Sequence, residues 1–164
     1  PRALEETDPG FQHYPAANLP VVSDGGVTAR VIAGEAFGKR SPVKTLSDWF
    51  YVDLALDTGA TAPFDPDYEE RAIYVAEGAV EIAGDTFDSP QLLIFRPGDR
   101  ITLKAVTKTR MMLLGGATLE GPRHIWWNFV SSSRERIEQA KEDWVQGRFK
   151  PVTGETEFIP LPER

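Results

Sequence analysis

The sequence predicts an all-β barrel or sandwich followed by one α-helix near the C-terminus. Short β-rich segments separated by Gly/Pro turns recur at intervals of roughly 8–12 residues, which is typical of sandwiches and barrels. Apolar and polar residues alternate over 50–56, as in a strand with one buried face. After residue 132 the apolar residues take up helical spacing instead.

The chain divides into a lead-in arm and one larger domain. Residues 1–20 contain four prolines that interrupt any regular element, so an irregular arm is expected there. Residues 21–164 are expected to form the barrel with its helix and tail. Strands are predicted at 27–33, 50–56, 71–77, 79–82, 92–95, 101–105 and 111–114, with a loop at 34–39.

Two of these elements carry more detailed expectations. The segment 92–95 is almost entirely apolar, which predicts a strand buried on both faces. The helix is predicted over 133–146, because Ser132 and Glu135 fit a capping box and Gly147 is a typical helix stop.

Composition excludes several classes of protein. The 164 residues suffice for one domain with a core, and the net charge of -7 without a basic cluster argues against direct nucleic-acid binding. No apolar run has the length of a membrane span, and no signal segment is recognisable. The absence of cysteine excludes disulfides and thiolate sites. By default, a cytoplasmic protein is expected.

The stretch from Gly59 to Thr109 resembles the two motifs of cupins, small double-stranded β-helix (jelly-roll) barrels that usually hold a metal. The first motif runs Gly, five residues, His, any, His, three or four residues, Glu, six residues, Gly. Counted from Gly59, its two histidine places hold Asp65 and Asp67, and its closing glycine is Gly78. Its glutamate place holds Arg71, and Glu70 is the residue immediately before that place.

The second motif runs Gly, five residues, Pro, any, Gly, two residues, His. Counted from Gly98, its last three places hold Lys104, Val106 and Thr109. The resemblance therefore implies a cupin barrel that lacks all three histidine ligands. First-row transition metals favour imidazole or thiolate donors at such places, so we expect no metal, cofactor-binding or catalytic residue in this chain.

A few polar and aromatic residues leave alternatives open. Asp65, Asp67, Glu69 and Glu70 could hold a hard cation such as calcium, although a solvated acidic loop is the simpler interpretation. His13 has no neighbouring ligand, and His124 could act as an acid or base but sits beside tryptophans like a packed residue. Trp126 and Trp127 could stack a planar ligand or, more simply, cover a neighbouring domain.

Segments at both ends of the chain resemble the C-terminal half of bacterial pirins, namely 11–14, 31–38, 123–132 and 154–162. Pirins are bicupins, so this chain would be the second half of one. The family implies a metal, usually iron, held by three histidines and a glutamate in the first cupin. Its members are similar to quercetin 2,3-dioxygenases or act as transcriptional co-regulators. No residue of this chain matches the family's ligand set.

From this resemblance we expect a metal-free C-terminal cupin that completes a two-domain protein, in a structural or ligand-pocket role. One alternative is part of a metal-dependent quercetin 2,3-dioxygenase, with iron or another divalent metal in the N-terminal cupin. The other is a protein-interaction module of a co-regulator. Because the arm, the run 126–129 and the tail 158–162 carry surplus apolar surface, the expected partner is the N-terminal cupin or a second copy. No dioxygenase activity is expected from this chain alone.

Overall fold

The computed structural model describes residues 1–64 and 68–162, and its contacts divide the chain into two compact units. The barrel unit comprises residues 8–118. The second unit combines residues 1–7 with 119–164, so it is built from both ends of the chain. The sequence-based division into an arm and one barrel domain stays a prediction. No helix in the described residues is both long and apolar enough to cross a membrane.

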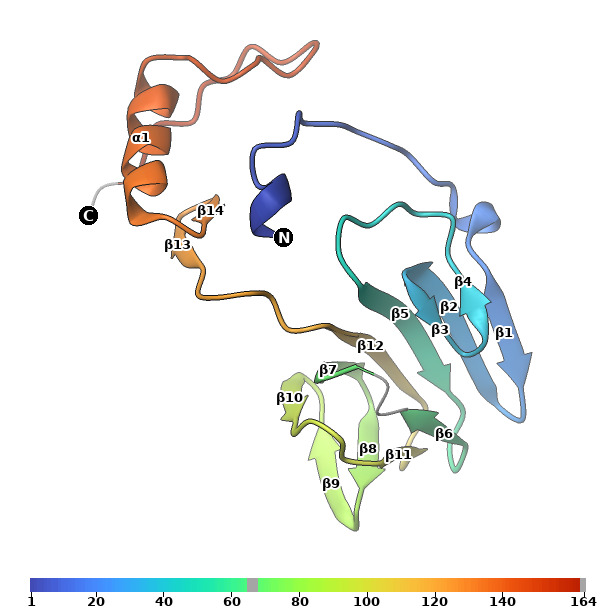
Figure 1. The fold of residues 1–164 in the computed structure, drawn as a ribbon. Coiled ribbons are helices and arrows are strands. Elements are labelled where there is room, and N and C mark those ends of the chain that lie inside the picture. The colour runs from blue at the N-terminus through green and yellow to red at the C-terminus, as the bar shows by residue number, and fades with distance from the viewer. Residues whose placement is uncertain (65–67, 163–164) are drawn as a thin grey trace. The chain divides into compact units, whose positions relative to one another are not determined.

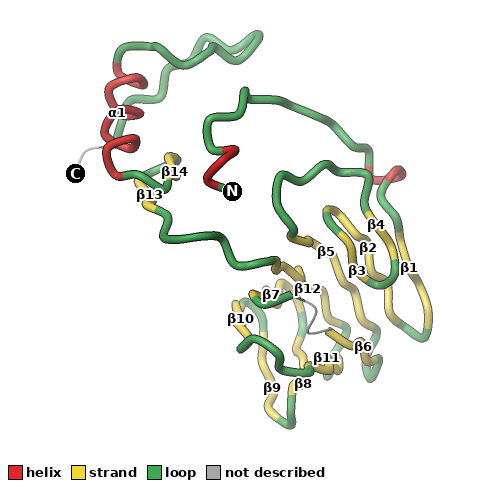
Figure 2. The backbone as a smooth tube through the Cα atoms, in the orientation of Figure 1, coloured by secondary structure: helices red, strands yellow, loops and turns green. Residues whose placement is uncertain are grey.

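The barrel unit is built from antiparallel strands, as Figures 1 and 2 show. One sheet has six strands in the order β1-β2-β5-β12-β7-β10, another has four in the order β6-β11-β8-β9, and β3 and β4 form a separate ribbon. The strands are β1 Val21–Asp24, β2 Val27–Ala33, β3 Glu35–Ala36, β4 Lys39–Arg40, β5 Trp49–Leu56, β6 Thr61–Phe64, β7 Glu70–Glu77, β8 Ala79–Ile82, β9 Asp85–Asp88, β10 Gln91–Phe95, β11 Ile101–Ala105 and β12 Thr109–Gly116. A short 3-10 helix, η2 (Ala16–Asn18), precedes β1.

The core of the barrel unit follows the alternation seen in the sequence. On β5 the even-numbered residues from Phe50 to Leu56 are buried, and the odd-numbered residues between them are only partly covered. Leu103 of β11 and Leu113 of β12 join the same core. A strand with period-two patterning buries one face, so the predicted strand at 50–56 is confirmed with its orientation.

Strand β10 differs from its prediction. Leu92 is 54% exposed and Ile94 is 78% exposed, while Leu93 and Phe95 pack against the core. The prediction of burial on both faces is therefore wrong for this chain. An apolar run does not reveal whether anything covers its second face, and β10 is the edge strand of the six-stranded sheet.

The predicted loop at 34–39 is a small hairpin made of β3 and β4. Phe37 and Gly38 form its turn with φ values of 51° and 67°. Two successive residues with positive φ are typical of a tight two-residue hairpin turn, although Phe is an unusual first residue there. Composition alone did not indicate this turn.

The second unit contains a short hairpin and one α-helix. Its elements are η1 Arg2–Leu4, β13 His124–Trp126, β14 Phe129–Ser131 and α1 Arg134–Val145. The helix is confirmed, but its cap is one residue later than predicted. Ser133 accepts a hydrogen bond from the backbone N–H of Arg136 at 3.2 Å and donates to Glu135 at 2.7 Å. Gly147, with a φ of 64°, ends the helix as expected.

Candidate functional site

Arg71 occupies the barrel end where the glutamate of the first cupin motif would stand. Its side chain is buried, and its guanidinium donates hydrogen bonds to three backbone carbonyls: Phe64 at 3.1 Å, Arg96 at 3.2 Å and Asp99 at 2.7 Å. The guanidinium also lies 5.5 Å from the centre of the Phe64 ring. Arg71 therefore ties the end of β6 to the turn between β10 and β11.

A guanidinium at this place has a chemical consequence. Arginine stays protonated in proteins and has no lone pair to offer, so it can neither ligate a divalent cation nor accept a proton. Within the described part of the chain, no three His, Cys, Asp or Glu side chains gather closely enough to hold a metal. Asp65 and Asp67, at the histidine places, lie outside the described residues. The metal-free barrel thus stays a prediction, and Arg71 is an observation that favours it.

Thr109 does not share a site with Arg71. On β12, Thr109 pairs with Leu56 and Gly115 pairs with Arg71, and these two β12 positions lie roughly 20 Å apart along an extended strand. The Thr109 hydroxyl instead lies 2.8 Å from the carbonyl oxygen of Ala79. The count of the second motif from Gly98 is therefore wrong.

The register corrects that count. If Gly98 is taken as the second glycine of the motif, the histidine place falls on Ile101, which opens β11 opposite Phe64. The turn around Gly98 contains two of the carbonyls that Arg71 binds, so it lies at the right barrel end. Ile101 packs against the apolar core. The adjacent Pro97-Gly98 turn was the sequence signal that would have located it.

A cavity of about 470 Å³ opens in the barrel unit at the end where Arg71 lies. Its apolar walls include the rings of Phe50, Phe64 and Tyr68. The Phe50 and Phe64 rings meet edge to face at 5.8 Å, and the Phe50 and Tyr68 rings lie 4.8 Å apart. Its polar lining comes from Glu35, Arg40 and Asp48, the first two on the β3–β4 hairpin.

Of the two carboxylates that line this cavity, one is paired with a cation and the other is not. Arg40 donates to Glu35 at 2.6 Å, which pairs their charges. No ion pair to Asp48 is formed by residues 1–64 or 68–162. Burial, followed by the negative charges of Asp48 and Glu35, raises the pKa of Tyr68. The hydroxyl of Tyr68 therefore stays protonated at neutral pH and serves as a donor.

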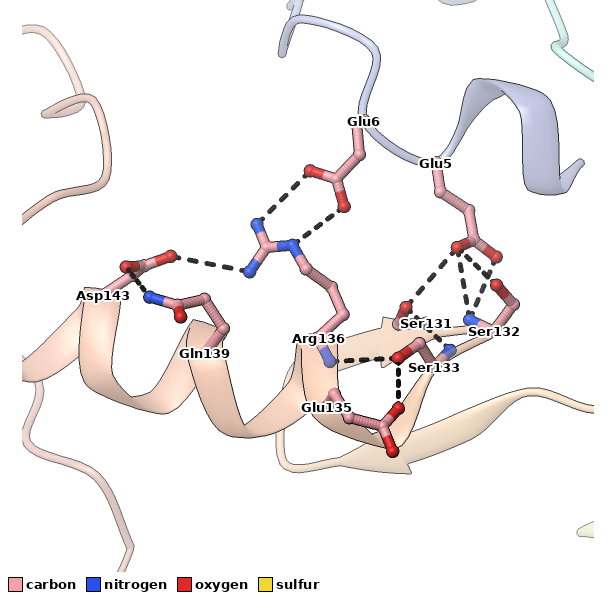
Figure 3. Close-up of polar contacts among 9 residues, drawn as sticks. All are labelled: Glu5, Glu6, Ser131, Ser132, Ser133, Glu135, Arg136, Gln139 and Asp143. Atoms are coloured by element: carbon pink, nitrogen blue, oxygen red, sulfur yellow. Dashed lines mark hydrogen bonds and ion pairs between the residues drawn. The ribbon is translucent and has the colours of Figure 1, made fainter.

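In the second unit, two glutamates anchor the N-terminal segment, as Figure 3 shows. Glu5 accepts hydrogen bonds from the Ser132 backbone at 3.0 Å and hydroxyl at 2.9 Å, and it pairs with Arg123 at 3.2 Å. Glu6 pairs with Arg136 at 2.8 Å. Desolvation raises the pKa of Glu5, but the Ser132 hydrogen bonds and Arg123 outweigh it and hold that pKa below its ordinary value.

The aromatic residues of the second unit pack on one another. Contacts between rings 5.2–6.3 Å apart connect Trp126, Trp127, Phe129, Trp144, Phe149 and Phe158. Such edge and stacked contacts are typical of packed aromatic rings, although Trp127, Phe149 and Phe158 remain 38%, 40% and 61% exposed, so the cluster lies at the surface of this unit. This arrangement favours packing over a stacked planar ligand.

The histidines and the remaining acidic residues are also placed. His13 is exposed in the barrel unit, and His124 is half-buried on β13 in the second unit. Glu69 and Glu70 are exposed, and Glu70 is the first residue of β7. None of these described side chains belongs to a group of three His, Cys, Asp or Glu residues that could hold a metal ion.

Comparison with known proteins matches residues 51–150 to the family model described as the pirin C-terminal cupin domain. A pirin-like protein from Caulobacter vibrioides is 50% identical over 99% of this chain and 57% of its own length. A candidate quercetin 2,3-dioxygenase from Pseudomonas aeruginosa is 31% identical over 90% of this chain and 47% of its own length. The chain thus spans about half the length of the curated relatives it matches.

A solved structure agrees with these matches. Quercetin 2,3-dioxygenase from Acinetobacter baumannii superposes with a TM-score of 0.84 at 25% identity, over 91% of this chain and 54% of that one. The predicted cupin jelly roll with one C-terminal helix is therefore confirmed.

Proposed function

The chain belongs to the pirin family, as its C-terminal cupin domain, and on this premise we propose that it is the packing half of a two-domain protein. Its proposed role is to dock onto an N-terminal cupin and stabilise it. The observation that carries this proposal is the exposed apolar part of the outer face of the six-stranded sheet.

That outer surface is formed by neighbouring strands. On β10, Leu92 and Ile94 are exposed, and Leu92 pairs with Tyr74 of β7, which is 42% exposed. Tyr74 in turn pairs with Met112 of β12. We call the surface formed by Leu92, Ile94, Tyr74 and Met112 the β10 patch. Contiguous apolar surface of this kind generally marks a site of protein contact.

Charged residues border the β10 patch on the side toward β5. Asp53 of β5 pairs with Met112 across the ladder, and its carboxylate binds Arg110 through two 2.9 Å hydrogen bonds. Arg30 of β2 lies 3.8 Å from the same carboxylate. An apolar centre with a charged rim is the usual composition of a specific interface.

The occupant that we propose is the N-terminal half of the parent protein. The matched relatives are about twice as long as the region they share with this chain, so each carries a further segment of comparable size. A domain that is always joined to another can leave a face uncovered by its own residues, and the linked half is then the partner at highest effective concentration.

The second candidate function concerns the activity of the longer parent protein. The names of the Pseudomonas relative and the Acinetobacter structure favour a quercetin 2,3-dioxygenase parent, with its metal in the N-terminal half. Ring opening by oxygen is chemistry that a redox metal supplies. This chain places Arg71 where a ligand would stand, so its proposed share of that enzyme is structural. Nothing in the described residues favours the co-regulator alternative.

The packing role is tested by mixing this chain with the separately produced N-terminal half of its parent. Ile94→Lys places a charge in the β10 patch and is expected to weaken association by about 10- to 100-fold, since burial of such a side chain contributes about 1.5–3 kcal/mol. Val21→Lys is the matched control, because Val21 is 43% exposed on β1, at the opposite edge of the same sheet.

Sedimentation velocity gives both affinities. Equal weakening by the two variants, or none by either, would contradict docking through the β10 patch. Concentration-dependent self-association that Ile94→Lys abolishes would instead identify a second copy as the occupant. Oxygen consumption with quercetin and added iron tests the second candidate function, the dioxygenase activity. Turnover by this chain alone would overturn the structural role.

A further inference from the structure

The barrel cavity has the properties of a binding site that is independent of docking through the β10 patch. Its volume of about 470 Å³ lies within the range of small-molecule sites, about 300–1,000 Å³. Phe50 and Phe64 form its deep apolar wall and are 3% and 5% exposed. A cavity of this size with aromatic walls and a few polar groups is the usual architecture of a ligand pocket.

The polar lining supplies more acceptors than available donors. Glu35 and Asp48 contribute carboxylates. The guanidinium of Arg40 is already engaged by Glu35, and the hydroxyl of Tyr68 interacts with Asp48. Glu35, Arg40 and Asp48 are exposed, so water solvates their charges while the cavity is open. A ligand that covers these carboxylates displaces that water and must bring N–H or O–H donors in its place, and an anionic ligand would meet a carboxylate that no cation in the described residues pairs with.

The aromatic walls add a second preference. The edge-to-face arrangement of Phe50 and Phe64, with Tyr68 at 4.8 Å from Phe50, presents ring faces and edges in different orientations. Ring faces attract organic cations, and a neighbouring carboxylate strengthens that attraction. Arg71 is the opposing charge near Phe64, but its guanidinium donates to three carbonyl oxygens whose dipoles offset it.

We propose that this cavity binds a protonated organic amine with a compact apolar or aromatic body, held by Asp48 through its ammonium group and by Phe50, Phe64 and Tyr68 through its body. The site lies wholly in the barrel unit and needs no metal. It goes beyond the packing role, and either proposal can fail without the other.

The test compares three probes of similar shape by isothermal titration calorimetry on the full 164-residue chain. Phenethylammonium carries the charge, 2-phenylethanol is its neutral counterpart and 3-phenylpropionate is the anion. Saturable binding is expected for the ammonium, with the alcohol at least about tenfold weaker, since a hydrogen bond between two charged groups is stronger than one from a neutral donor. Equal binding of the alcohol, or tighter binding of the carboxylate, would overturn the proposal.

Two substitutions sharpen the result. Asp48→Asn keeps the side-chain shape and is expected to weaken ammonium binding about tenfold, whereas Asp85→Asn, the same change in the β8–β9 hairpin outside the cavity, should have no effect. Arg40→Gln releases Glu35 and should tighten ammonium binding. Loss of binding in Arg40→Gln, or an unchanged affinity in Asp48→Asn, would show that the charge preference is wrong. Circular dichroism confirms that each variant is folded.

Discussion

Gly78 offers a sharp test of how the barrel is closed. It joins β7 to β8 with a φ of 77°, and a Cβ atom added there would lie 2.2 Å from the carbonyl oxygen of Lys108. Backbone atoms cannot move aside as the end of a flexible side chain can. Gly78→Ala should therefore destabilise the fold through both backbone strain and overlap.

The magnitude follows from those two contributions. A left-handed conformation costs a non-glycine residue about 1–2 kcal/mol, and forced overlap in a packed region costs about 1–3 kcal/mol more. Gly59→Ala is the matched control, because Gly59 has a φ of 82° but, among the described residues, nothing lies within 4 Å of the added Cβ. The expected losses are about 2–5 kcal/mol for Gly78→Ala and about 1–2 kcal/mol for Gly59→Ala.

Urea unfolding followed by tryptophan fluorescence and circular dichroism measures both variants. With a urea dependence of about 1–3 kcal/mol per molar, the two midpoints should differ by roughly 1 M. Equal midpoints for the two alanine variants would refute the close approach of Lys108. A larger loss in Gly59→Ala than in Gly78→Ala would refute it as well.

Two further predictions concern buried and acidic groups. Arg71→Met should lower the free energy of unfolding by about 3 kcal/mol or more, because three carbonyls lose their donor at about 1 kcal/mol or more each; a loss below about 1 kcal/mol in urea unfolding would contradict its bridging role. Glu5 has a lowered pKa, so its contribution to stability is present above the usual glutamate range and is lost as the pH falls through its folded pKa. An NMR titration should therefore show the Ser132 amide released only below that usual range. In Glu5→Gln the Ser132 amide should not titrate, and a normal glutamate midpoint in the unmutated chain would argue against the anchor.

The sequence by itself determined the longer core strands, the helix and the family, but not the short strands β1, β3, β4, β6, β9, β13 and β14. Alternation over 50–56 fixes which side chains enter the core, because side chains on a strand point to opposite faces in turn. Capping and helical spacing located the helix to within one residue at its start. The spacing of Gly59 and Gly78 indicated a cupin, and the structure shows that both adopt positive φ.

Only the tertiary structure decided that one face of β10 is uncovered, and which positions of the two motifs lie at the same end of the barrel. The exposure of Leu92 and Ile94 depends on β10 being an edge strand with an uncovered face, and local hydrophobicity carries no information about either. Counting along the chain put Thr109 at the histidine place of the second motif, yet the ladder places Ile101, not Thr109, at the barrel end where Arg71 lies. Spacing along one chain fixes how far apart two residues are in sequence. Which strand ends lie together is set by pairing between distant segments, where a shift in register changes every neighbour.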